Sequence, residues 1–327
     1  MEAKKIVIIG AGQLGSRHLQ GVLKYQNPLQ IWVVDPNETS LDIAKQRAGE
    51  ISHEHKVVYQ ASTDHIDKYI DIAIVATNSA VREKVTLNLL KNFTVKYLIL
   101  EKVLFQNEQA YNNVSDALAS CNTLAWVNHP RRMFNHYQEI KRTIGNHKSI
   151  QFSVVGNNWG LGCNGLHLLD ICSFLSSDNN IKSIDLSALD RETTPSKRDG
   201  YIEFSGTLNV LFENGSTASI TSRNSEAPGP ITVFIGSEGD KWAIQEGGTN
   251  NIIHIDSQNN YKSTIKPFNP EFQSDLSTQL IDSLILNGEC DLPTYKEAQS
   301  IHVPFIKELL HFFNTLHNKN DKDLKIT

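Results

Sequence analysis

The chain has 327 residues, of which 39% are hydrophobic and 20% charged, and its formal net charge is −5 at pH 7. This length and composition are typical of a globular protein of two domains, and the acidic balance excludes a basic surface for nucleic acid or anionic membranes. No apolar run approaches the roughly 20 residues of a membrane span, and the cysteines lack zinc or C-x-x-C spacing. Because the first strand begins almost at once, we expect no signal peptide. We therefore expect a cytoplasmic protein with reduced thiols and no metal site.

The first residues of the chain predict a strand, a glycine turn and a helix in succession. Ile6–Ile9 is a β-branched run that suits a strand buried in a parallel sheet, and apolar spacing after the turn indicates a helix. Between them the glycines follow the pattern G-x-G-x-x-G. Gly10 allows a sharp turn, Gly12 lets a pyrophosphate approach the backbone, and Gly15 lets the helix pack close to the strand. The alternative is a glycine turn with a purely structural role.

A carboxylate follows the second predicted strand, Ile31–Val34, twenty residues after Gly15. This is Asp35, which is placed to accept hydrogen bonds from the ribose of an adenosine. Its charge disfavours a 2′-phosphate and no arginine follows it directly, so we expect NAD rather than NADP as the cofactor. The cofactor-binding residues expected in this region are Gly10, Gly12, Gln13, Leu14, Gly15 and Asp35.

Strands and helices alternate over residues 1–125, which predicts a Rossmann domain with a doubly wound parallel sheet. The expected elements are a helix at 40–48, strands at 56–59, 71–76, 96–100 and 124–127, and helices after residue 79 and at 108–120. Polar residues stand at the carboxyl ends of these strands, where such folds bind ligands. They are Thr77, Asn78, Glu101, Lys102 and Asn128. We expect them to lie along one cofactor crevice.

Residues 126–327 predict a substrate-binding and oligomerisation domain of the α+β class with an open, largely antiparallel sheet, whose C-terminal helix could pack back on the first domain. A strand at 149–157 and a helix at 165–175 precede a strand-rich region, in which Asn214-Gly215 is a turn signal between strands at 202–212 and 216–222. Short strands at 231–235, 241–245 and 252–256 follow, and then a long helix that contains Phe305–Phe313. The polar tail 317–327 is expected to fray.

The helix at 165–175 and the residues just before it carry one polar stripe. Cys163, His167 and Asp170 are spaced i, i+4 and i+7 on a segment that is otherwise apolar. Imidazole titrates near neutral pH, so His167 is the candidate general acid/base for a hydroxyl proton, and Asp170 could orient it. The alternative is a buried polar network with no role in catalysis.

Other candidates have equally simple alternatives. Lys102 is either catalytic or a solvated partner of Glu101, and Trp159 either packs on a sugar or belongs to the core. Arg198 lies in a basic loop that could meet a substrate phosphate or carboxylate. Arg131-Arg132 could pair with cofactor, substrate or Glu101. The candidate substrate-binding residues are Lys102, Trp159, Cys163, Asn164, His167 and Arg198.

Taken together, these motifs resemble the glucose-fructose oxidoreductase / inositol dehydrogenase (Gfo/Idh/MocA) family over nearly the whole chain. The segments that carry the resemblance are Gly10–Gly15, Val75–Asn78, Glu101-Lys102-Val103, Arg131–Met133 with Tyr137, Gly165–Asp170, Phe212–Gly215 and Ile235–Gly239. The resemblance implies hydride transfer between nicotinamide and a secondary alcohol of a sugar, nucleotide sugar or cyclitol. It also implies that Lys102 contacts the reacting hydroxyl, that His167 is the acid/base, and that the open sheet forms a homodimer or homotetramer.

The sequence departs from the family at two positions. The usual Glu-Lys-Pro is Glu101-Lys102-Val103, which puts the geometry given by that proline in doubt, and Cys163 stands where the family often has an aspartate. A thiol is a weaker hydrogen-bond acceptor than a carboxylate. The run 157–165 also resembles a branch found with surface-glycan biosynthesis. A dinucleotide-binding sensor or regulator without turnover is the rival interpretation, because the family includes such proteins.

Overall fold

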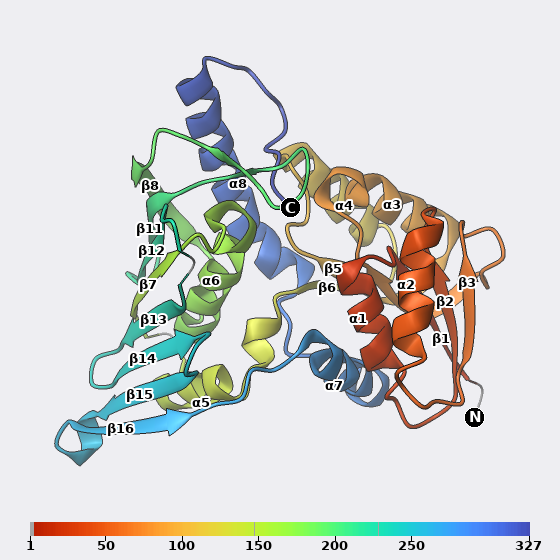
Figure 1. The fold of residues 1–327 in the computed structure, drawn as a ribbon, viewed down its shortest axis with the longest axis horizontal. Coiled ribbons are helices and arrows are strands. Elements are labelled where there is room, and N and C mark those ends of the chain that lie inside the picture. The colour runs from red at the N-terminus through yellow and green to blue at the C-terminus, as the bar shows by residue number, and fades with distance from the viewer. Residues whose placement is uncertain (1–2, 147, 228) are drawn as a thin grey trace. The chain divides into compact units, whose positions relative to one another are not determined.

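The computed structural model describes residues 3–146, 148–227 and 229–327, and the chain divides into two compact units (Figure 1). Unit 1 comprises Met1–Phe105, Gln109–Pro130 and Glu271–Lys296; unit 2 comprises Gln106–Glu108, Arg131–Pro270 and Glu297–Thr327. No described helix is both long and apolar enough to cross a membrane.

Unit 1 is the predicted Rossmann domain. Its elements are β1 (Lys4–Ile9), α1 (Gln13–Val22), β2 (Leu29–Val34), α2 (Glu38–Ala48), β3 (Lys56–Gln60), β4 (Tyr69–Val75), α3 (Ser79–Asn92), β5 (Thr94–Glu101), α4 (Glu108–Ala119), β6 (Leu124–Asn128) and α7 (Gln273–Asn287). The strands pair in parallel in the order β3-β2-β1-β4-β5-β6. The order reverses beside β1, so the carboxyl ends of β1 and β4 form the point at which such sheets bind ligands.

The units differ from the predicted division at residue 125, because α7 belongs to unit 1 although it is distant in sequence. It lies beside α1 (Figure 1). The close approach requires Gly21, since a Cβ there would lie 2.3 Å from the carbonyl oxygen of Ser274. Pattern analysis of the sequence missed α7 altogether.

Unit 2 contains the predicted open sheet. Its elements are a 3₁₀ turn (Pro130–Met133), α5 (Asn135–Ile144), β7 (Gln151–Asn157), α6 (Leu161–Ser176), β8 (Ile181–Leu189), β9 (Thr194–Pro195), β10 (Ile202–Glu203), β11 (Gly206–Phe212), β12 (Thr217–Arg223), β13 (Ile231–Gly236), β14 (Lys241–Glu246), β15 (Asn251–Asp256), a second 3₁₀ turn (Ser257–Asn259), β16 (Lys262–Pro267) and α8 (Tyr295–His317), whose first two residues belong to unit 1.

The large sheet of unit 2 has the order β16-β15-β14-β13-β7-β12-β11-β8. Its pairs are antiparallel except that β7 and β12 run parallel, so the expected largely antiparallel sheet is confirmed. Helix α6 packs on β12 and beside α5 (Figure 1). The predicted Asn214-Gly215 hairpin joins β11 to β12, and Gly215 has a φ of 85°.

Two predictions for unit 2 are wrong. The expected strand 202–212 is two strands, because Gly206 turns the chain with a φ of 99° in a space where a Cβ would lie 2.6 Å from the backbone of Ala188. The tail does not fray at its end. Leu324 and Ile326 are fully buried, and the carbonyl of Lys325 accepts a hydrogen bond from the amide of Ile202 at 2.8 Å.

Candidate functional site

The glycine turn between β1 and α1 has the geometry that the fingerprint predicts. Gly10 has a φ of 95°, and a Cβ there would lie 2.8 Å from the backbone of Thr77. A Cβ on Gly15 would lie 1.8 Å from the carbonyl oxygen of Gly10, so only glycine lets α1 approach the turn. A Cβ on Gly12, in contrast, would have no atom within 4 Å. The backbone at Gly12 is thus open on the side where a pyrophosphate would approach.

Asp35 lies at the carboxyl end of β2 and is bonded to the glycine turn. Its carboxylate accepts hydrogen bonds from the amide of Ala11 at 2.7 Å and from the amide of Asn37 at 2.9 Å. A carboxylate has about four lone-pair sites, so Asp35 keeps acceptor capacity for a ribose hydroxyl. The structure therefore adds to Asp35 a second role, in which it fixes the turn.

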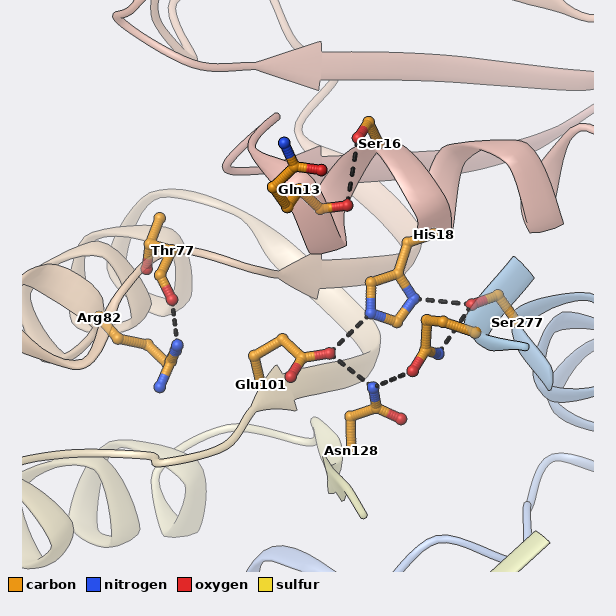
Figure 2. A network of polar contacts seen from close by, with 9 residues as sticks. Gln13, Ser16, His18, Thr77, Arg82, Glu101, Asn128 and Ser277 are labelled. Atoms are coloured by element: carbon orange, nitrogen blue, oxygen red, sulfur yellow. Dashed lines mark hydrogen bonds and ion pairs between the residues drawn. The ribbon is translucent and has the colours of Figure 1, made fainter. Parts of the chain in front are cut away.

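A buried network underlies the carboxyl edge of the sheet in unit 1 (Figure 2). His18 of α1 bonds Glu101 through Nε2 at 2.8 Å and Ser277 of α7 through Nδ1 at 2.8 Å. Asn128 donates to the same Glu101 oxygen at 2.5 Å and to Gln273 at 3.0 Å, and Gln273 donates to Ser277. The network ties two strand ends to α1 and α7.

Glu101 is the centre of this network and is 2% exposed. Burial opposes its ionisation, but the hydrogen bond and charge of His18 and the amide of Asn128 together bring the pKa of Glu101 below its ordinary value. A buried carboxylate with such donors holds the preceding strand end in place. Glu101 was predicted to bind cofactor, whereas its recorded partners are protein groups.

Arg82, on α3, joins the loops that carry two groups of candidate residues. It is buried, and its guanidinium donates to the carbonyls of Thr77 and Val103 and, at 2.9 Å, to that of Leu104. The peptide bond between Lys102 and Val103 is cis, although residue 103 is not proline. Asn78 caps α3 as predicted, accepting from the amide of Val81 at 3.3 Å.

In unit 2, the predicted polar stripe lies on α6. Cys163 is partly exposed, and its Sγ is 3.9 Å from the hydroxyl oxygen of Ser196. His167, one turn further, is 8% exposed. The first turn of α6 is capped by Glu203, whose carboxylate accepts from the amides of Gly162 at 2.8 Å and Cys163 at 3.3 Å. This carboxylate compensates the positive end of the helix dipole.

Asp170, the third residue of the stripe, forms a buried ion pair with Arg132. The arginine approaches both carboxylate oxygens at 2.8 Å, in a two-pronged contact. Burial raises the pKa of Asp170 to about 6, and the charge of Arg132 opposes that rise. The contact with Arg132 shows that Asp170 anchors α6. That Asp170 also orients His167 stays a prediction.

Arg131 also pairs within unit 2, where the open alternatives were cofactor, substrate or Glu101. Its guanidinium lies 2.8 Å from Glu246, which also accepts from the hydroxyl of Tyr137 at 2.7 Å. Burial opposes ionisation of Glu246, but Arg131 keeps the pKa of its carboxyl below the ordinary value. Neighbouring His136 is 7% exposed, and burial lowers its pKa to about 4, so it is neutral near pH 7.

The remaining substrate candidates bond mostly to backbone. The indole of Trp159 donates to the carbonyl of Thr221 at 2.9 Å, and Asn164 donates to the carbonyl of Trp159 at 2.6 Å. Arg198 is exposed and lies 3.4 Å from the hydroxyl of Thr327. These contacts fix Trp159 and Asn164 in unit 2 and leave Arg198 on the surface.

Sequence reasoning missed several residues that organise these groups. His18, Arg82 and Ser277 are polar side chains fully or almost fully buried on helices. A buried histidine or arginine on an apolar helix face is a signal that could have been read, since such groups need partners. Their partners, however, come from distant parts of the chain.

Comparison with known proteins agrees with the geometry of unit 1. Residues 4–129 match the family model described as "Oxidoreductase family, NAD-binding Rossmann fold". The match covers all six strands of the parallel sheet, β1 to β6, and less than half of the chain. The match agrees, over these residues, with the resemblance to the Gfo/Idh/MocA family that the motifs indicate.

Solved structures extend the likeness of fold to nearly the whole chain. UDP-N-acetylglucosamine 3-dehydrogenase GnnA from Acidithiobacillus ferrooxidans is 13% identical, with 95% of this chain and 97% of that chain covered and a TM-score of 0.69. Levoglucosan dehydrogenase in complex with NADH is 12% identical, with 96% and 98% covered and a TM-score of 0.72. A super-repressor mutant of Gal80p from Saccharomyces cerevisiae is 14% identical, with 97% of each chain covered and a TM-score of 0.71. These identities show a shared fold alone. No curated protein sequence matches the chain.

The glycine turn allows a matched pair of substitutions that separates folding from binding. We expect Gly15→Ala to lower the free energy of unfolding by about 3 kcal/mol or more, because its Cβ would overlap the Gly10 carbonyl. Gly12→Ala should leave thermal unfolding nearly unchanged and weaken NADH binding about tenfold, because its methyl group enters the space of the pyrophosphate. Calorimetry and NADH titration of both variants test this. Unchanged NADH affinity in Gly12→Ala would contradict the site.

Proposed function

We propose that this protein transfers hydride between NAD and a secondary alcohol or ketone of a sugar, nucleotide sugar or cyclitol. The observation that carries the proposal is the glycine turn, which is closed to side chains at Gly10 and Gly15 and open at Gly12. Asp35, fixed beside that turn, favours NAD through its charge. A role in surface-glycan biosynthesis is a finer proposal, supported by the likeness in fold to a UDP-N-acetylglucosamine dehydrogenase.

The proposed chemistry needs one hydride and one proton to leave the same alcohol. When bound, NAD accepts the hydride from the carbon, and the C–H and O–H bonds break as the C=O bond forms. The hydroxyl proton passes to a side chain of this protein, for which Lys102 and His167 are the candidates. Reduction of a ketone reverses both transfers. The rival proposal, a dinucleotide sensor, is supported by Cys163 at the family's aspartate position and by the likeness in fold to Gal80p.

Cofactor titration is the direct test of the proposed function. We expect NADH to quench tryptophan emission by energy transfer at lower concentrations than NADPH does, because Asp35 repels a 2′-phosphate. A preference for NADPH would overturn the role of Asp35 and keep the enzyme. Binding of neither dinucleotide would contradict the function itself.

Substitution of His167 tests the proton transfer. After a screen of sugars, nucleotide sugars and cyclitols for NADH formation, we expect His167→Ala to lower kcat about a hundredfold or more and to leave NADH affinity little changed. His311→Ala, at an exposed position of α8, is the control. Unchanged turnover would remove His167 from the mechanism, and NADH binding without turnover on any substrate would favour the sensor.

We also propose that the protein assembles as a homodimer or homotetramer through the open sheet. A cross-strand row runs from Ser153 through Phe234, Ala243 and Ile253 to Ile265. Phe234 is 46%, Ile253 39% and Ile265 67% exposed. The row borders a mostly apolar hollow of about 590 Å³. Exposed apolar surface of this kind is typical of a protein interface, and a second copy presents the same face.

Light scattering after size-exclusion chromatography tests the assembly. Phe234→Asp should reduce the mass to that of a monomer, because a charge in an apolar interface loses its hydration without gaining a partner. Leu286→Asp is the matched control, since it places the same charge at a residue of α7 that is 76% exposed. An unchanged mass in Phe234→Asp would show that this face is not the interface.

A further inference from the structure

Arg47, near the end of α2, holds the first turn of α1. Its Nη1 donates to the carbonyl of Gln13 at 3.2 Å and to the hydroxyl of Ser16 at 2.6 Å, and its Nη2 donates to the Gln13 side-chain oxygen at 2.6 Å. The Ser16 hydroxyl in turn donates to the carbonyl of Gly12 at 2.8 Å. Arg47 therefore fixes both the backbone and a side chain at the start of the helix that follows the glycine turn.

The other end of Arg47 is also held. Gln20, two turns along α1 from Gln13, donates from its amide to the carbonyl of Arg47 at 3.1 Å and to Glu50 at 2.7 Å. The backbone of Arg47 is thus bonded to Gln20, in the second half of α1, and its guanidinium is bonded to the first turn of the same helix. A guanidinium held at both ends loses little further freedom when a ligand binds.

No ion pair neutralises the charge of Arg47 among the residues that the structure describes. Within residues 3–146, 148–227 and 229–327, no carboxylate lies at ion-pair distance from it, and the first turn of α1 carries no acidic residue. That turn already has the partial positive charge of a helix N-terminus. Two positive groups at one place are stabilised when an anion binds there. Three of the five N–H donors of the guanidinium bond to protein, which leaves two.

We propose that Arg47 is a positioning residue of the pyrophosphate site: it holds Gln13 and Ser16 in place and adds a positive charge that the diphosphate of the cofactor neutralises. This inference rests on the proposed binding of NAD. Sequence reasoning overlooked the residue because it lies twelve positions beyond Asp35, and only an arginine directly after Asp35 was considered, as a contact for a 2′-phosphate.

The test compares two arginines on NADH affinity. Arg47→Met keeps most of the side-chain length and removes the charge and donors, and Arg47→Lys keeps the charge. Arg17→Met is the matched control: it removes the same charge from an exposed residue of α1 whose guanidinium bonds Gln20 at 2.7 Å. NADH dissociation constants are measured by tryptophan energy transfer between low and high salt, with thermal unfolding of each variant.

We expect Arg47→Met to weaken NADH binding about tenfold at low salt and to make the dissociation constant depend less on salt. The reason is that the variant loses the positive charge that attracts the diphosphate. Arg47→Lys should recover part of the affinity and most of the salt dependence, and Arg17→Met should bind like the wild type. If Arg47→Met and Arg47→Lys both match Arg17→Met at every salt concentration, Arg47 only fastens α2 to α1 and the inference is wrong. Failure of the wild type to bind NADH would instead overturn the proposed function.

Discussion

The buried hydrogen bond between His18 and Glu101 is the contact on which the carboxyl edge of the sheet in unit 1 depends. Glu101 is 2% exposed. Without hydrogen-bond donors around it, a carboxylate buried this deeply would take up a proton or move toward solvent. His18 supplies one donor and Asn128 the second, while Ser277 and Gln273 of α7 hold those donors in place (Figure 2). Lys102 follows Glu101 directly, so the network sets the backbone from which the candidate catalytic lysine projects.

Three further side chains hold the loops at this edge in place through hydrogen bonds within unit 1. Asp35 accepts a hydrogen bond from the amide of Ala11. Arg82 donates to one carbonyl in the loop after β4 and to another in the loop after β5, and Arg47 donates to the first turn of α1. Such prior ordering lowers the entropy that a ligand loses on binding. In unit 2 the same principle applies to α6, which Glu203 caps and Arg132 anchors through Asp170.

Pattern reasoning on the sequence predicted the glycine turn correctly, because the residues that form it are close together in the chain. The strand, glycine turn and helix of residues 6–22 are contiguous, and Gly10 and Gly15 are dictated by backbone sterics within a few residues of one another. It recovered less of α6, where the stripe of Cys163, His167 and Asp170 was found but the partner of Asp170 was not. Arg132 lies 38 residues away in sequence, and no periodicity connects the two.

The sequence by itself determined the alternation of buried strands and helices, the dinucleotide fingerprint and the strand-rich second half, because hydrophobic period and turn chemistry act over short stretches of chain. The tertiary structure alone decided that α7 joins unit 1, that the residues around Ile326 are buried, and that Arg131 and Arg132 pair with Glu246 and Asp170. Those outcomes depend on which distant surfaces fit together at close range. Packing of that kind is a property of the folded chain that no local pattern encodes.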